Sequence, residues 1–204
     1  DAIKAYSDYQ QFVKNPGPLV IGAMQNSSIL GPVYEFAFLA DADLRRRNLR
    51  DRVPITLITP EPYVGHLGLG AESDTRRLLE QALDERNITY LTNVKTRKID
   101  PGVVHIAECD AQGKEVRTME IPFTYSVYWA AFKGIRALRE SVGLTDARGF
   151  VITDDYLRSP EFPNIFAVGV CGAHPSASNS PLPVGAPDSV YSIQNEVDAT
   201  VRNI

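Results

Sequence analysis

The sequence is poor in cysteine, because only Cys109 and Cys171 occur among its 204 residues. Two cysteines so far apart predict neither a disulfide-rich scaffold nor a CxxC redox motif. Neither has metal-ligand spacing to a histidine, so we expect no metal site. The scarcity of thiols fits a reducing compartment. These shortages exclude a small domain held together by disulfides and a zinc-binding module.

An excess of positive charge is also missing. The chain has 21 Lys and Arg against 25 Asp and Glu, which gives a net charge of -4 and predicts no nucleic-acid partner. No hydrophobic run reaches the length of a transmembrane helix, and no signal peptide is visible. The composition, 44% hydrophobic and 23% charged, is typical of a globular domain with a core of useful size. Because the chain starts at Asp1 rather than Met, we expect a piece of a longer protein.

The first part of the chain predicts a strand-helix-strand unit. Residues 18–23 are short and wholly apolar, as in a central parallel strand. Apolar residues keep helical spacing over 32–48, and 53–59 predicts the second strand. Such a unit requires a parallel sheet.

The turn after the first strand departs from the dinucleotide fingerprint GxGxxG. Gly22 fills the first glycine position, but Met24 fills the second and Ser27 the third. A side chain at Met24 would block the close approach of a pyrophosphate. We therefore predict the fold of a dinucleotide domain that has lost the binding, and NAD is not an expected cofactor.

From residue 94 to 122 the hydrophobic period changes to two. Segments 95–99, 103–109 and 116–121 predict antiparallel strands, with a hairpin turn at 110–113. The aromatic-rich segment 123–132 predicts a further strand, whose rings either pack in the sheet core or line a flavin or quinone pocket. The predicted fold class is α/β, a Rossmann-like three-layer parallel sheet with an antiparallel β-meander.

The stretch from 163 to 188 carries the main candidate site. Residues 165–168 predict a buried strand, Gly169 lets backbone come close to a neighbour, and Pro187 with Asp188 would open a helix. A strand ending in Gly, a loop and a helix N-terminus can form a site for a large anionic or dipolar ligand, with Cys171 inside it. The alternative is an ordinary strand-turn-helix with a buried free thiol.

Five segments together resemble a known family. They are residues 17–23, 31–36, 61–66, 164–170 and 183–187. In order and spacing this set resembles sulfide:quinone oxidoreductases, within the FAD-dependent pyridine nucleotide-disulfide oxidoreductase superfamily.

The resemblance implies two intertwined domains. Residues 1–16 would be a connecting helix, 17–121 a degenerate nicotinamide-type domain, and 122–204 the returning part of the FAD-binding domain. FAD would belong to the intact protein. Because the family's own GxGxxG lies before the first residue of this chain, we expect the fragment not to retain FAD and to be inactive by itself.

The resemblance also implies site residues. Cys171 is the candidate catalytic thiol, and the positive end of the last helix would face the flavin's pyrimidine edge. Val170 stands where the superfamily normally has an Asp, a replacement shared by the sulfide-oxidising branch. The implied cofactor-binding residues are Gly169, Val170, Gly185, Ala186 and Pro187.

Two departures leave the function open. The family's chemistry uses a pair of cysteines, but Ile29 and Tyr156 stand where relatives would place them, and Asp188 stands where relatives often have a Lys. The first hypothesis is an enzyme that passes electrons from sulfide through flavin to quinone, at a membrane surface or in the cytoplasm, as a homo-oligomer. The second is a redox-inactive flavin-binding or scaffold relative. The third, an NADH-dependent flavoenzyme, is disfavoured by Met24.

Overall fold

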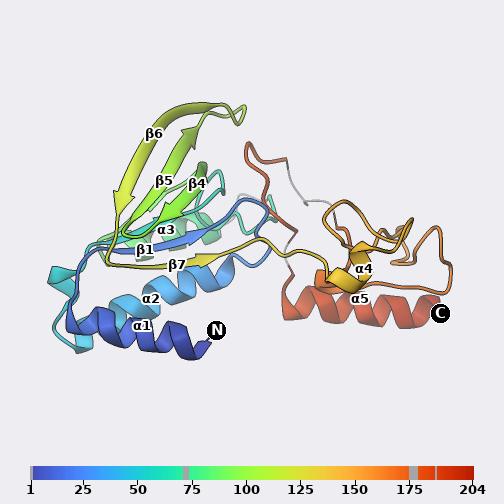
Figure 1. The fold of residues 1–204 in the computed structure, drawn as a ribbon, viewed down its shortest axis with the longest axis horizontal. Helices are drawn as coiled ribbons and strands as arrows, with labels where there is room; N and C mark the ends of the chain where they lie inside the picture. The colour runs from blue at the N-terminus through green and yellow to red at the C-terminus, as the bar shows by residue number, and fades with distance from the viewer. Residues whose placement is uncertain (1, 71–73, 175–178, 187) are drawn as a thin grey trace.

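The computed structural model describes residues 2–70, 74–174, 179–186 and 188–204, which form a mixed α/β structure (Figure 1). A parallel sheet has the order β3-β2-β1-β7, and an antiparallel sheet has the order β4-β5-β6. The strands are β1 (Leu19–Ala23), β2 (Ile55–Ile58), β3 (Ile88–Leu91), β4 (Val94–Asp100), β5 (Val103–Cys109), β6 (Glu115–Pro122) and β7 (Tyr125–Trp129). The helices are α1 (Ala2–Lys14), α2 (Gly31–Arg46), α3 (Asp74–Asp84), α4 (Arg136–Arg139) and α5 (Val190–Asn203), with 3-10 turns η1 (Arg50–Arg52) and η2 (Gly169–Cys171).

Strand β1 is the centre of the parallel sheet. Leu19 pairs with Ile55 of β2 on one side and with Tyr125 of β7 on the other, and both pairings are parallel. All five residues of β1 are buried. The predicted strand-helix-strand unit is therefore confirmed as β1-α2-β2.

The two faces of the parallel sheet bury different layers. Because side chains alternate along a strand, Leu19 and Ile21 pack with α2, while Val20 packs with Val104 and Ile106 of the meander. Figure 1 shows α1 and α2 below the sheet and β4 to β6 above it. The predicted fold class, three layers with an antiparallel meander, is confirmed.

Strand β7 bears on the predicted division into domains. It lies within 122–204, yet it is hydrogen-bonded along the whole of β1. The division stays a prediction, and this pairing favours a boundary after Trp129 rather than after Ile121. Beyond β7, the chain forms the second lobe of Figure 1, where α4 and α5 stand among long loops.

The predicted strand at 165–168 is wrong as an extended strand. Phe166 forms one isolated antiparallel bridge with Arg158, and the left-handed backbone of Gly169, at φ 57°, begins the turn η2. Two backbone hydrogen bonds make this bridge, from the Ser159 N–H to the Ile165 carbonyl and from the Ala167 N–H to the Leu157 carbonyl. The pairing stops there, so residues 165–168 do not form a strand of a sheet.

The last helix begins later than predicted. Pro187 lies outside the described residues, and Asp188 precedes the helix instead of opening it. The N-cap is Ser189, whose side chain accepts a hydrogen bond from the Ser192 N–H, so α5 begins at Val190. In the described part of the chain, no helix combines the length and apolarity needed to cross a bilayer.

Candidate functional site

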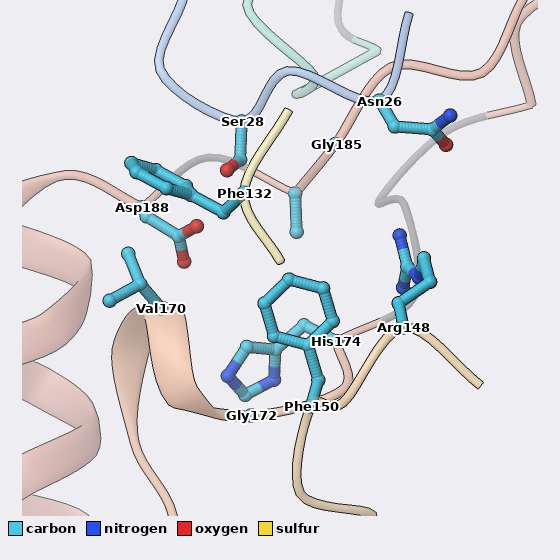
Figure 2. Close-up of a pocket in the computed structure, with 11 residues that line it drawn as sticks. Asn26, Ser28, Phe132, Arg148, Phe150, Val170, Gly172, His174, Gly185 and Asp188 are labelled. Carbon is cyan, nitrogen blue, oxygen red and sulfur yellow. The ribbon is translucent and has the colours of Figure 1, made fainter. Parts of the chain in front are cut away.

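A small cavity opens where three loops meet, and we call it the interloop cavity (Figure 2). It has a volume of about 40 Å³, which is room for a few waters or the edge of a planar ring. Both parts of the stretch singled out by the sequence reach this cavity. The first contributes residues between Gly169 and His174, and the second contributes Gly185, Ala186 and Asp188. Its described lining is Asn26, Ser28, Phe132, Arg148, Phe150, Val170, Gly172, His174, Gly185, Ala186 and Asp188.

One wall of the cavity is a pair of loops bonded to each other. The Asn26 N–H donates to the Pro183 carbonyl at 2.7 Å, and the Gly185 N–H donates to the Ser27 carbonyl at 3.1 Å. A Cβ on Gly185 would lie 2.9 Å from the backbone nitrogen of Ser28. Glycine is therefore required here for the contact between the two loops.

Gly169 serves packing within the chain. Its φ of 57° is in the left-handed region, and a Cβ there would lie 2.9 Å from Cγ1 of Ile193 on α5. Its N–H donates to Oε2 of Glu196, also on α5, at 2.5 Å. The neighbour to which Gly169 comes close is thus α5, which the turn η2 holds in place.

His174 adds a second link to the same turn. Its Nε2 lies 3.1 Å from the Gly169 carbonyl and 3.7 Å from Oε2 of Glu196. Gly172 makes room for this ring, since a Cβ at that position would lie 2.5 Å from Nε2. The imidazole is fixed against the turn while it lines the cavity.

Asp188 brings a half-buried carboxylate to the cavity. Burial raises its pKa, and the negative charge of Glu196 acts in the same direction. A hydrogen bond with Ser28 and the nearby His174 oppose that rise without cancelling it, so the pKa stays above the ordinary range. The sequence offered only one sign of this role, the acid directly before a helix.

Cys171 does not fit the interpretation of a buried thiol. It is exposed, and it is not among the described side chains that line the cavity, although its neighbours Val170 and Gly172 are. Cys109, by contrast, is buried at the end of β5.

The two positions expected to hold cysteines lie in different surroundings. Ile29 lines a second, largely apolar cavity of about 610 Å³, which we call the apolar cavity and which also receives Asp188. Tyr156 lines a separate hollow with Phe166 and Asn203. Neither position is among the described residues that line the interloop cavity, so a cysteine at either one would not line it directly.

Tyr128 explains the first glycine of the degenerate fingerprint. Gly22 pairs with it across β1 and β7, and a Cβ on Gly22 would lie 2.4 Å from the Tyr128 ring. Burial raises the pKa of this phenol to about 12. Gly22 therefore accommodates a side chain of the same sheet, which accounts for this glycine by packing within the chain.

A buried carboxylate that the sequence analysis missed anchors the glycine-rich loop 63–70. Glu61 is fully buried and accepts hydrogen bonds from the Tyr34 hydroxyl at 2.5 Å, the Thr59 hydroxyl at 2.7 Å and the Leu67 N–H at 2.8 Å. Burial raises its pKa, against the pull of these donors. The available signal was an acid between two prolines directly after a buried strand. His66 is also buried, and its Nδ1 accepts from the Gly68 N–H.

Comparison with known proteins decides the family. The chain is 34% identical, over 206 aligned positions, to the sulfide-quinone reductase of Aquifex aeolicus (strain VF5), a match that covers all of this chain and 46% of that protein. The X-ray structure of the sulfide:quinone oxidoreductase from Aquifex aeolicus superposes with a TM-score of 0.89, over 97% of this chain and 45% of that one. This chain is sulfide:quinone oxidoreductase-like. The resemblance inferred from its segments is confirmed.

Other comparisons add the fold alone. The NAD-dependent persulfide reductase of A. fulgidus matches with a TM-score of 0.58 at 20% identity, over all of this chain and 34% of that one. No family model matches. The sulfide:quinone oxidoreductase-like chain spans about half the length of the curated relative, 46% of it.

Proposed function

We propose that the intact protein is an FAD-dependent oxidoreductase of the sulfide:quinone type, to which this chain contributes one wall of the flavin site. The observation that carries the proposal is the meeting of the Gly169–His174 and Gly185–Asp188 segments at one cavity, in a chain similar to such enzymes along its whole length. Its small volume and two aromatic rings fit one edge of a planar cofactor.

Named residues would hold that edge. The backbone at Gly185 and Ala186 and the side chain of Val170 would contact the ring, with Phe132 and Phe150 beside it. Pro187 and Gly169 belong to the same proposal, Gly169 by fixing the turn that carries Val170. When bound, FAD would supply two-electron transfer between donor and acceptor.

Cys171 is the proposed donor-side thiol. It is exposed and adjacent in sequence to two residues of the cavity wall, so its sulfur is accessible from solvent beside the proposed flavin edge. The absence of cysteine at Ile29 and Tyr156 supports the alternative, a redox-inactive flavin-binding or scaffold relative. The proposed partners of the intact enzyme are sulfide and quinone, at a membrane surface and in a homo-oligomer.

The departure from the dinucleotide fingerprint after β1 counts against NAD as a second cofactor. Tyr128 occupies the space over Gly22, and Met24 adds a side chain at the second fingerprint position. The side chain of Met24 opposes the close backbone approach that a pyrophosphate needs at the second position, and Gly22 is accounted for by packing against Tyr128.

The test uses the full-length protein, purified without added flavin. We expect near-stoichiometric FAD that is bleached anaerobically by sulfide and left oxidised by NADH. Flavin that is present but unchanged by sulfide would favour the redox-inactive alternative, and bleaching by NADH would revive the third hypothesis. Cys171→Ala should abolish sulfide-dependent bleaching, while Cys109→Ala, a change at a thiol in the meander, should leave it intact.

A further inference from the structure

Asp188 stands at the boundary between the two cavities. Its carboxylate lines the interloop cavity and also the apolar cavity, beside Ser28 in both. Figure 2 shows it near Ser28, Phe132 and Val170, on the segment that leads into α5. The residue that follows it, Ser189, is the N-cap of that helix.

The groups around Asp188 come from every loop that meets there. They are the Ser28 hydroxyl from the turn after β1, His174 from the turn after η2, Glu196 from α5, and Arg148 across the cavity. The ion pair of Arg148 is with Asp146, at 3.3 Å. His174 also lies 3.1 Å from the Gly169 carbonyl and 3.7 Å from Glu196, so it is not committed to Asp188.

We propose that Asp188 sets the charge at the cofactor edge of this site and, when ionised, lowers the reduction potential of the bound flavin. The inference rests on the proposed flavin site. Two-electron reduction with uptake of one proton adds one negative charge to a flavin, and charge near the ring tunes that step. The positive end of α5 favours the added charge, whereas the Asp188 carboxylate in front of it opposes it.

A dependence on pH follows from the same geometry. When Asp188 takes up a proton, the opposing charge disappears and the end of α5 acts on the ring unopposed. Its raised pKa brings this exchange closer to neutral pH than for an ordinary aspartate. Because a reduced flavin carries more negative charge, it raises the pKa of Asp188 further, and reduction takes up one extra proton only between the pKa of Asp188 beside the oxidised ring and its pKa beside the reduced ring.

The test is a spectroelectrochemical titration of FAD in the full-length protein between pH 5 and 9. Asp188→Asn should raise the midpoint potential, favouring the reduced form on the order of tenfold at neutral pH, and should flatten the pH dependence. Ser28→Ala, which removes a hydrogen bond to the ionised carboxylate, should shift the potential the same way by less. Asp198→Asn removes an equal charge from the exposed part of α5 and should match the unmodified protein.

The outcomes separate this inference from the proposed function. If both variants bind FAD at the unmodified potential, the role of Asp188 is overturned while the flavin site stands. If the full-length protein holds no FAD, the flavin site and this role fall together. A carbon-13 titration of the Asp188 carboxyl in the present chain, without FAD, should show ionisation above the ordinary aspartate range, and an ordinary curve would also contradict the proposal.

Discussion

The backbone N–H of Gly169 donates to Oε2 of Glu196 at 2.5 Å, which ties the turn η2 to the middle of α5. This bond joins residues 27 positions apart, and Val170, the residue after Gly169, lines the interloop cavity. A hydrogen bond to a charged acceptor is stronger than one between neutral groups. The pair is thus a principal attachment of the last helix to the candidate site.

Removing that acceptor should loosen the helix. We expect Glu196→Ala to lower the free energy of unfolding by about 1–2 kcal/mol, because the Gly169 N–H then loses its partner. Glu196→Gln retains an acceptor oxygen and should lose less than half as much. Thermal unfolding of the two variants checks this, and equal losses would show that the hydrogen bond contributes little.

Gly169 itself should tolerate no side chain. An alanine at φ 57° is strained, and its Cβ would lie 2.9 Å from Ile193, so Gly169→Ala should cost about 2–3 kcal/mol. Gly102→Ala is the matched control, because φ there is 82° and the nearest atom lies 3.8 Å away, which leaves strain of about 1 kcal/mol. Denaturant titration measures both, and similar costs would rule out the contact with α5.

The packing of Gly22 against Tyr128 predicts strong coupling. Gly22→Ala should cost about 1–3 kcal/mol, since its Cβ would lie 2.4 Å from the ring. In Tyr128→Ala, which itself costs about 3–5 kcal/mol, the ring is gone and the added methyl should cost almost nothing. A double-mutant cycle measures the difference, and additive losses would contradict the contact.

The ion pairs of Asp41 should make the folded protein less stable in acid. Burial alone would raise its pKa, but hydrogen bonds from Arg45 at 2.8 Å and Arg50 at 2.6 Å outweigh it, and the pKa is lowered from its ordinary 3.8. The ionised Asp41 carboxylate, held by its two arginines, therefore contributes stability above pH 3.8. This stability is lost as the pH falls through the lowered pKa that Asp41 has in the folded protein.

Asp41→Asn should accordingly destabilise the protein at pH 7 by about 2–3 kcal/mol and by much less at pH 2. Urea unfolding at both pH values tests this. Asp51→Asn, at an exposed neighbouring aspartate, should change neither value, and a loss for Asp41→Asn that is independent of pH would disprove the ionic origin.

Much of the fold could be predicted because local patterns decide it. The wholly apolar segment 18–23 could only be a buried strand, and the period of two in 95–121 required antiparallel pairing. The start of α5 was predicted too early because Pro187 and Asp188 satisfy first-turn preferences, whereas the Ser189 side chain supplies the actual cap.

The candidate site could be predicted only as a pair of segments. That the loops at Gly169 and Gly185 meet was expected from the family resemblance, but their partners were not, because Ile193 and Ser28 are distant in sequence. The exposure of Cys171 depends on the direction of a single 3-10 turn. Sequence patterns specify which face of an element is buried far better than they specify the path of an irregular loop.

The backbone bonds from Asn26 to Pro183 and from Gly185 to Ser27 have a mechanical consequence. They fasten the loop before α5 to the turn that leaves β1, so these two parts of the chain share one rigid seam. A hinge motion that separated the lobes at this point would have to break both bonds at once. A ligand that enters the interloop cavity therefore meets a wall whose two loops are already joined before it binds.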